Sequence, residues 1–214
     1  MTSQGAKNAH QKRSRQTRDK LLNALEKLLK EKDFGDISVA EIAANAGVST
    51  ASIYRRFDKK NGFISVLFDL YLERLQEWSQ SPEARLDLEG CALREALQQI
   101  VFAGWRQITH QAHIMRAIHL HGRNHLRMIG DKVEAYEEST FQTIRMLVDL
   151  YQGEIKRGDP DTTARMLAYY LNNIMMEKAL FADYGATFGL ELENRKFTDE
   201  LADFAYGYLR TPTP

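Results

Sequence analysis

The stretch ISVAEIAANAGVSTASIYRRFDKKNGF, residues 37–63, decides the fold because it contains the start and stop signals of two short helices. Ser38 precedes Glu41 by three residues, the capping-box spacing in which each side chain bonds an exposed backbone N–H of the other. Gly47 stands where a helix can end in a left-handed residue, and Ser49 is a favourable N-cap for the next helix. The stretch therefore predicts two short helices joined by a sharp glycine turn.

Helical periodicity extends on both sides of this stretch, because apolar residues recur every three to four positions. Strand-like alternation and internal repeats are not apparent in the sequence. We therefore expect an all-α fold. Helices are predicted over residues 13–33, 39–46, 50–57, 60–79, 88–111, 112–121, 124–157, 160–182 and 197–210.

The composition fits a globular helical protein: 43% of the 214 residues are hydrophobic and 27% are charged, which allows a buried core and a charged surface. No apolar run reaches the ~18 residues that a membrane helix needs. The polar, basic start MTSQGAKNAHQKRSRQTRDK lacks the apolar segment of a secretion signal. The single cysteine excludes an intramolecular disulfide, so we expect a cytoplasmic protein.

The charges are divided unevenly along the chain. Residues 1–62 hold 13 Lys and Arg against 7 Asp and Glu, whereas residues 63–214 hold 16 against 22. This asymmetry favours an N-terminal module for a polyanion and a C-terminal module with another task. A chance charge fluctuation on an ordinary helical protein is the alternative. Residues 1–12 lack apolar periodicity, and we expect them to form a flexible basic arm.

The residue types in the glycine-turn stretch suit a helix-turn-helix. Ala43 and Ala46 are small enough to let the two helices approach closely, while Val48 and Ile53 fill the wedge between them. The second helix keeps small and polar residues on its outer side. Such a helix fits a DNA major groove, which is about 12 Å wide.

The same stretch resembles the signature of the TetR family of bacterial transcriptional repressors, over about residues 15–65. The matching residues are Ser38, Ile42, Ala43, Ala46, Gly47, Val48, Ser49, Tyr54, Phe57 and Lys60. The resemblance implies a three-helix DNA-binding domain over residues 13–60 and a helical effector-binding and dimerisation domain over residues 61–214. The sequence departs from the family pattern at Asn61, Gly62 and Arg56. At the position of Arg56 the family often has His.

The resemblance also implies roles for single residues. Thr50, Ala51 and Ser52 would face base edges at the start of the recognition helix, and Tyr54 and Lys60 would contact phosphates. Solvation of an exposed face is the alternative interpretation of the arginines. Further DNA-binding candidates are Arg55, Arg56, Lys59, Ser38, Ser49 and Arg18.

Methionines and aromatic residues are frequent in the C-terminal part of the chain, and they suit an adaptable apolar pocket. Core packing is the alternative for each of them. The segment LNNIMMEKALFADYG, residues 171–185, resembles the penultimate helix of the repressors of the ethionamide-activating monooxygenase. That resemblance implies that Asn173, or alternatively Asn172, anchors a ligand. The other ligand-binding candidates are Trp105, Met115, Met128, Tyr136, Phe141, Tyr169 and Met176.

Two further patterns bear on metals and on dimerisation. Five of the six histidines lie between His110 and His125, but without nearby Cys or carboxylate ligands they favour a polar surface or pocket over a metal site. The helices over 160–182 and 197–210 carry more apolar residues than one core needs, and we expect them to form a homodimer interface.

The sequence favours a TetR-type regulator, most simply a repressor, that binds a palindromic DNA operator as a dimer and is released by a small, largely apolar effector. The alternative is a regulator of the same fold that answers to a protein partner. An enzyme is not expected, because we find no phosphate-binding glycine loop, nucleophile signature or paired carboxylates. We expect no cofactor and no metal.

Overall fold

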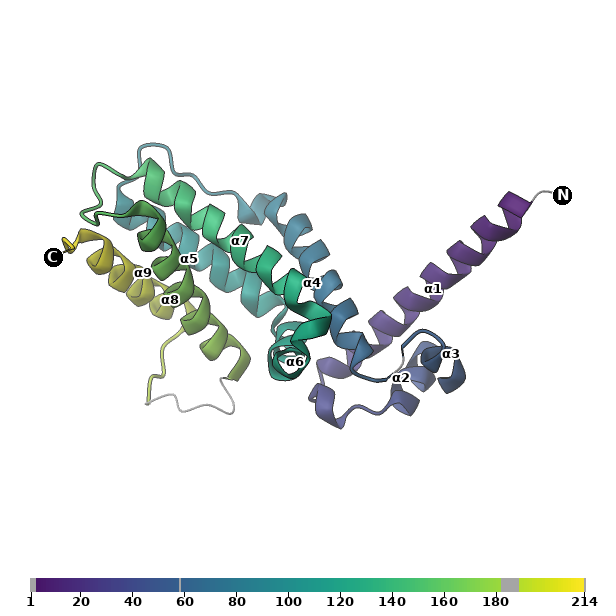
Figure 1. Cartoon of the computed structure of the whole chain (residues 1–214). Helices are drawn as coiled ribbons and strands as arrows, with labels where there is room; N and C mark the ends of the chain where they lie inside the picture. The colour runs from purple at the N-terminus through teal and green to yellow at the C-terminus, as the bar shows by residue number, and fades with distance from the viewer. Residues whose placement is uncertain (1–2, 58, 182–188, 214) are drawn as a thin grey trace. The chain divides into compact units, whose positions relative to one another are not determined.

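The computed structural model describes residues 3–57, 59–181 and 189–213, and within these ranges every regular element is helical, which confirms the all-α expectation (Figure 1). The long helices are α1 (Ser3–Leu29), α4 (Gly62–Ser79), α5 (Leu93–His110), α6 (Ala112–Gly122), α7 (Leu126–Leu150), α8 (Pro160–Phe181) and α9 (Asn194–Arg210). The short ones are η1 (Phe34–Asp36), α2 (Val39–Ala46), α3 (Thr50–Tyr54), η2 (Pro82–Ala84) and η3 (Arg123–His125).

Several helix ends differ from those predicted, and local geometry explains two of them. Helix α5 begins after Gly90, which has a left-handed φ of 72°, and the Glu95 carboxylate accepts from the N–H of Ala92 at 3.2 Å. Helix α7 ends at Leu150 because the chain turns there, and the N–H of Lys156 donates to a carbonyl of α9 at 2.9 Å. Periodicity alone does not reveal either stop.

The N-terminal segment also differs from expectation in its backbone. Helix α1 begins at Ser3, so residues 3–12 of the expected arm are helical. Its early residues include Gln, Ala and Lys, which favour helix even without an apolar face. The flexibility and the DNA-binding role of this segment stay predictions.

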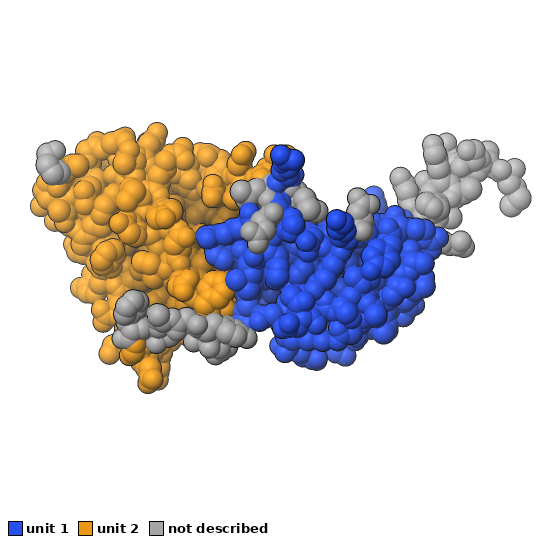
Figure 2. Space-filling view, turned by 60° about the horizontal axis from the view of Figure 1, so that its bottom comes forward, with its two compact units in different colours: residues 1–70, 113–129 blue, residues 71–112, 130–214 orange. Residues whose placement is uncertain are grey.

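The described chain divides into two compact units (Figure 2). Unit 1 comprises residues 1–70 and 113–129, and unit 2 comprises residues 71–112 and 130–214. Helix α6 belongs to the same compact unit as the helix-turn-helix, because its side chains complete the core of that unit. The functional division expected after residue 60 stays a prediction.

Helix α2 has the predicted caps at both ends. The Ser38 hydroxyl accepts from the N–H of Glu41 at 3.2 Å, and the Glu41 carboxylate accepts from the N–H of Ser38 at 2.7 Å. Lys32 also bonds this carboxylate, and these donors lower the pKa of Glu41 to about 2. Gly47 ends the helix with φ 64°, and the N–H of Val48 then bonds the Ala43 carbonyl at 3.0 Å.

The core of unit 1 is formed where α1 packs on α2 and α2 packs on α3. Helix α6 contributes through His113, whose Nε2 lies 3.2 Å from the Glu26 carboxylate, and through His121, whose ring lies 5.0 Å from that of Phe34. Gly122 is required here, since a Cβ would meet the Ile129 side chain at 2.5 Å. Fully buried side chains of this unit include Leu21, Leu25, Ile37, Ile42, Ile53, Phe63, Ile64 and Leu67.

Gly62, one of the departures from the TetR pattern, has a packing reason. A Cβ at this position would lie 3.3 Å from the Phe57 side chain. Phe57 stacks on Phe63 with ring centroids 4.1 Å apart. The glycine lets α4 begin close against the end of the recognition segment. A second departure, Asn61, forms a hydrogen bond with His125 at 2.8 Å.

Unit 2 is a helical bundle in which α5 packs against both α8 and α9. Trp105 of α5 lies against Phe197 of α9, with ring centroids 5.1 Å apart. At the surface, Arg94 binds the Asp203 carboxylate through two hydrogen bonds of 2.7 and 2.6 Å. No helix in the described chain combines the length and the apolar character needed to cross a membrane.

Gly47→Ala should lower the free energy of unfolding by about 1–2 kcal/mol, because a side chain disfavours the left-handed backbone. The space around the Cβ is open, so the loss reports backbone strain alone. Gly130→Ala, at an equally open position inside α7, is the matched control and should raise the free energy of unfolding by up to about 1 kcal/mol. Urea unfolding measures both, and equal effects of the two substitutions would contradict the turn geometry.

Glu41→Gln should destabilise the protein at neutral pH and much less in acid. The pKa of Glu41 is lowered from 4.5 to about 2, so its stabilising effect is fully present above pH 4.5 and disappears as the pH falls through 2. Thermal unfolding of wild type and variant from pH 7 to pH 2 measures this difference. A gap between the two melting temperatures that stays constant across this range would refute the linkage.

Candidate nucleic-acid interface and ligand cavity

The start of α3 is fixed by two serines. The Ser49 hydroxyl accepts from the N–H of Ser52 at 3.3 Å, and the two hydroxyl oxygens lie 2.9 Å apart. The Arg55 guanidinium donates to the Ser52 hydroxyl at 3.1 Å. Ile53 is fully buried on the inner side, which directs the opposite face of the helix to solvent.

The outer face of α3 has the small and polar character that the sequence predicted. Thr50 and Ala51 are exposed, and 55% of Tyr54 is exposed although it is a large aromatic residue. Ser52 is half-buried because its hydroxyl takes part in the cap. These residues present a polar ridge that could enter a groove.

Three cations flank this ridge: Arg55, Arg56 and Lys59 are all exposed. Arg56 donates to the Ser14 hydroxyl of α1 at 2.8 Å, so the guanidinium is held between the two helices. Arg18, on the same long helix, is half-buried. The positive charge expected from the sequence is therefore present beside the recognition helix.

Lys60 and Ser38 differ from the remaining candidates because both have structural partners. The Lys60 ammonium donates to the Gly35 carbonyl at 2.8 Å and lies 4.6 Å from the centre of the Phe34 ring. Burial lowers the pKa of Lys60, and the carboxylates of Asp36 and Glu41 oppose this shift. The hydroxyl of Ser38 is occupied by the capping box. The structure thus gives both residues a packing role, and their assignment to the DNA-binding surface stays a prediction.

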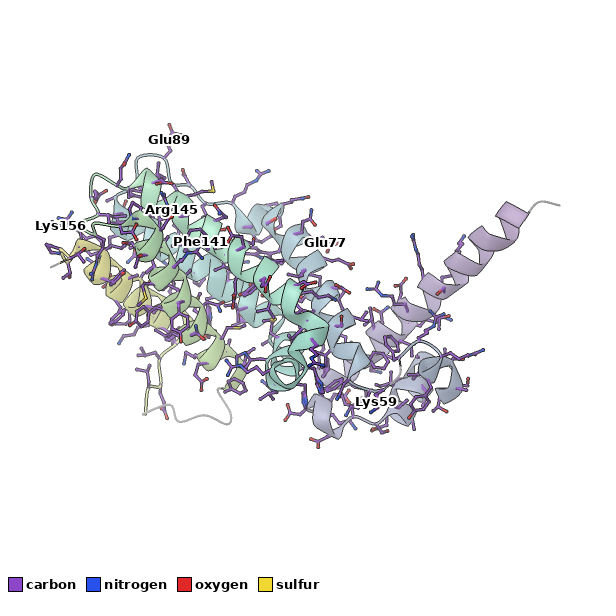
Figure 3. All side chains as sticks on the ribbon, in the orientation of Figure 1. Lys59, Glu77, Glu89, Phe141, Arg145 and Lys156 are labelled. Atoms are coloured by element: carbon purple, nitrogen blue, oxygen red, sulfur yellow. The ribbon has the colours of Figure 1, made fainter. Side chains whose placement is uncertain are left out.

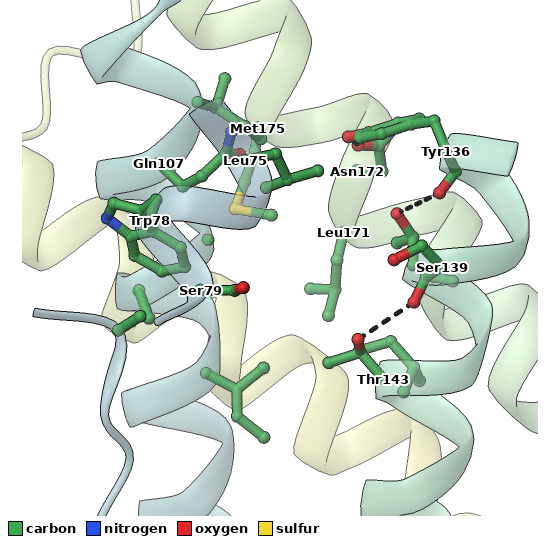
Figure 4. Close-up of a pocket in the computed structure, with 18 of the residues that line it drawn as sticks. Leu75, Trp78, Ser79, Gln107, Tyr136, Ser139, Thr143, Leu171, Asn172 and Met175 are labelled. Carbon is green, nitrogen blue, oxygen red and sulfur yellow. Dashed lines mark hydrogen bonds between the residues drawn. The ribbon is translucent and has the colours of Figure 1, made fainter. Parts of the chain in front are cut away.

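Unit 2 contains a cavity of about 520 Å³ lined by α4, α5, α7 and α8 (Figure 4). This volume lies within the range of roughly 300–1,000 Å³ typical of small-molecule sites. Its wall is mainly apolar and includes Leu75, Trp78, Leu171 and Met175. The cavity can accommodate a small molecule with a largely apolar body.

A chain of polar side chains borders one part of the cavity. The Gln107 amide donates to the Tyr71 hydroxyl at 3.0 Å, and the Tyr136 hydroxyl donates to the Asn172 carbonyl oxygen at 2.7 Å. Burial raises the pKa of Tyr71 and of Tyr136, so both phenols stay protonated at neutral pH. The cavity therefore combines an apolar wall with neutral hydrogen-bonding groups.

Two of the nine predicted ligand-binding residues, Tyr136 and Asn172, line the cavity. Asn173 does not: it is exposed, and its amide donates to the Tyr169 carbonyl at 2.7 Å. Residues 168, 171, 172 and 175 face the cavity at helical spacing, so Asn173 lies about 100° further around α8. Of the two candidates, Asn172 lies on the cavity wall, and a role for either residue in anchoring a ligand stays a prediction.

The remaining ligand candidates lie elsewhere. Trp105 packs on Phe197, and Tyr169 is 66% exposed. Phe141 lies on α7 (Figure 3), and the Arg165 guanidinium lies 4.0 Å from the centre of its ring. Met176 is buried outside the cavity lining, and Met115 is buried in unit 1. The side chain of Met128 lies outside the described residues. Aromatic and methionine content identified core residues more often than lining ones.

About half of the cavity residues that the sequence did not reveal are polar or small. The hydroxyls of Ser139, Thr140 and Thr143 follow Tyr136 on one face of α7, with the i, i+3, i+4, i+7 spacing of a helix face. That spacing is visible in the sequence. Gln107 and Gly104 of α5 gave no comparable signal.

The histidine cluster is dispersed by the fold. His113 pairs with Glu26, His121 packs on Phe34, and His125 bonds Asn61. Burial lowers the pKa of His121, and the Lys60 ammonium lowers it further. In the described part of the chain, no three potential metal-binding side chains come together.

The outer face of α8 and α9 carries exposed aromatic residues. Tyr169 and Tyr170 of α8 lie with ring centroids 6.3 Å apart, and Phe204 of α9 lies 6.3 Å from Tyr170. The exposed fractions of Tyr169 and Phe204 are 66% and 62%. Leu167, Leu171 and Leu201 of the same two helices are buried within unit 2.

Comparison with solved structures shows a shared fold. A TetR-family transcriptional regulator, PfmR, from Thermus thermophilus is 19% identical, with 91% of this chain and 99% of that chain covered and a TM-score of 0.54. FadR from Bacillus subtilis, solved with stearoyl-CoA, is 15% identical, with coverages of 88% and 97% and a TM-score of 0.61.

AibR, solved in complex with isovaleryl coenzyme A and operator DNA, is 16% identical, with coverages of 92% and 100% and a TM-score of 0.59. A search of curated proteins finds no match to the chain.

Residues 21–66 match the family described as bacterial regulatory proteins, tetR family. The matched segment contains α2, the Gly47 turn and α3, and ends in the first part of α4. The sequence match and the helix-turn-helix geometry agree, and the structural likeness covers most of the chain. Residues 21–66 therefore match the DNA-binding domain of the TetR family, and the chain as a whole shares the fold of these solved regulators.

Proposed function

We propose that this regulator is a repressor which binds a palindromic operator as a homodimer and is released by a small, largely apolar effector. The cavity of unit 2 is the observation that carries this proposal. A pocket of about 520 Å³ with an apolar wall and a few convergent polar groups has the features of a small-molecule site. The cytoplasmic location expected from the sequence stays a prediction.

The exposed aromatic face of α8 and α9 supports a homodimer. An apolar face of this kind is stabilised when a two-fold copy covers it, and two helices from each copy would form a four-helix interface. Two recognition helices related by a two-fold axis would read two half-sites spaced by whole turns of DNA. A palindromic operator follows from that symmetry.

Helix α4 is the element through which an effector could act. It begins at Gly62 in unit 1 and ends at Ser79 in unit 2, where Leu75 and Trp78 line the cavity. Release requires that the effector bind a state unsuited to DNA more tightly than the DNA-binding state, because equal affinity for both would shift nothing.

For DNA contact we propose Thr50, Ala51 and Tyr54 on the face of α3, with Arg55, Arg56 and Lys59 beside them. Their exposure supports this role. Cations that contact the DNA phosphates supply affinity but do not distinguish one DNA sequence from another, whereas the small residues of α3 can approach the base edges. Ser52, Ser49 and Arg18 would support this surface through the cap and through α1.

Control by a protein partner is the second candidate. The exposed aromatic side chains Tyr169 and Phe204 favour it, since a partner instead of a second copy could cover them. Occupancy of the cavity by a small molecule distinguishes the two candidates.

Arg56→Ala and Lys59→Ala should each weaken operator binding and reduce the slope of log affinity against log salt by about 1, as expected for the loss of one phosphate contact. The measurement is fluorescence anisotropy with the DNA that flanks the gene for this protein, at several salt concentrations. Lys156→Ala removes an exposed lysine of unit 2 (Figure 3) and is the matched control. Equal effects of all three substitutions would exclude a local phosphate contact.

Ala135→Trp should fill the cavity from α7 and weaken binding of the neutral fluorescent probe N-phenyl-1-naphthylamine by about tenfold or more, while operator binding stays intact. Ala135 lines the cavity and is exposed, so the larger side chain is tolerated by the fold. Gln142→Trp, at an exposed position of α7 outside the lining, is the control. Undiminished probe binding by Ala135→Trp would favour control by a protein partner.

A further inference from the structure

We propose that the cavity of unit 2 selects a neutral ligand that has an apolar body and hydroxyl groups along one edge, of which a fatty monoester of a polyol is the simplest example. The inference rests on the proposed role of this cavity as the effector site and adds the chemical class of the effector.

The first argument is charge. Among the described residues that line the cavity, none is Asp, Glu, Lys, Arg or His. A carboxylate, phosphate or ammonium group that entered would lose its hydration without gaining an oppositely charged partner. The portion of the ligand inside the cavity is therefore uncharged. This differs from the CoA thioesters in the FadR and AibR complexes, whose phosphate groups need cations or solvent.

The second argument is the distribution of polar groups around the wall. Leu75, Trp78, Leu171 and Met175 form apolar surface, whereas four of the five lining hydroxyl groups lie on α7 and the fifth is that of Ser79 on α4 (Figure 4). The α7 side chains Ser139, Thr140 and Thr143 face the cavity from one side of that helix. A ligand that fits this wall has its main polar edge toward α7.

The third argument is the direction of the hydrogen bonds. The Thr140 hydroxyl donates to the Tyr136 carbonyl at 2.9 Å, and the Thr143 hydroxyl donates to the Ser139 carbonyl at 3.0 Å (Figure 4). Because these protons are used within α7, the two oxygens meet the cavity as acceptors. The ligand must therefore supply donors, and two oxygens three residues apart are offset by about 4.5 Å along the helix axis.

Asn172 adds the complementary group. Its carbonyl oxygen accepts from the Tyr136 hydroxyl at 2.7 Å, and the raised pKa of this buried phenol keeps the proton in place. The amide NH₂ of Asn172 then provides a donor on the cavity wall, for which the described chain shows no acceptor. A ligand carbonyl or ether oxygen near this end, followed by hydroxyl groups toward Thr140 and Thr143, pairs with these three side chains.

Three probes with the same alkyl chain separate charge from hydroxyl content: glycerol monodecanoate, methyl decanoate and decanoate, each below its micelle concentration. The reporter is the fluorescence of Trp78, which lines the cavity. The chain has two tryptophans, and Trp105→Phe in the full-length protein removes the other one, which packs against Phe197 outside the cavity. We expect the monoester to bind about tenfold more tightly than methyl decanoate, and decanoate to bind most weakly.

The double substitution Thr140→Val and Thr143→Val keeps the side-chain shape and removes both acceptors. It should weaken binding of glycerol monodecanoate by about tenfold and change that of methyl decanoate by less than about twofold. Thr109→Val is the matched control, because the Thr109 hydroxyl makes the same bond to the carbonyl four residues earlier, at 2.8 Å, but does not line the cavity. Thermal melting of each variant verifies that the fold is retained.

The outcomes separate this inference from the proposed function. If decanoate binds as tightly as the monoester, or if the double variant treats the monoester as wild type does, the ligand class is wrong while the effector cavity stands. If none of the three probes binds but N-phenyl-1-naphthylamine does, the ligand class is wrong while the effector cavity stands. If N-phenyl-1-naphthylamine does not bind either, both the ligand class and the effector role of the cavity are overturned. Operator binding, measured separately, tests the DNA-binding role alone.

Discussion

The left-handed backbone of Gly47 sets the direction in which the chain leaves α2, and the position of α3 depends on it. With φ at 64° the chain reverses within two residues, so that Ser49 can cap α3 and Ile53 can enter the core against α2. Because Ile53 fixes the inner side of α3, the opposite, polar side of this helix faces solvent. The residues of α3 that we propose for DNA contact are therefore exposed because Gly47 adopts a left-handed conformation, which glycine does at little cost.

The sequence was sufficient to predict the DNA-binding part in detail because its signals are local. The Ser38–Glu41 box, Gly47 and the Ser49 cap each act over three or four residues, and all are found in the structure. The cavity is different, since its wall is assembled from four helices far apart in the chain. The spacing of residues along α8 shows which side chains share a face, but it does not show which face is turned toward α4, α5 and α7. The sequence therefore favoured Asn173, whereas Asn172 lies on the cavity wall.

The two units also use polar residues in contrasting ways. In unit 1, charged and aromatic groups stabilise the packing. The Lys60 ammonium lies over the Phe34 ring, and the Glu41 carboxylate caps the start of α2. In unit 2, the cavity is bordered by neutral groups such as Gln107, Tyr136 and Asn172, and its described lining contains no formally charged side chain. A neutral wall makes recognition depend on the shape of the ligand and on the direction of its hydrogen bonds.

The discontinuity of unit 1 has a consequence for the modular exchange of regulators. Residues 113–129 complete the core that begins with residues 1–70, through contacts such as His121 on Phe34 and Ile129 beside Gly122. A chimaera that joins only the first 60 or so residues to a foreign sensor domain would expose the apolar surface that α6 covers. A graft of unit 1 onto another protein must therefore carry residues 113–129 as well as residues 1–70, as two separate inserted segments. Recombination between related genes meets the same restriction, because a single crossover cannot transfer both segments without the part of unit 2 that lies between them.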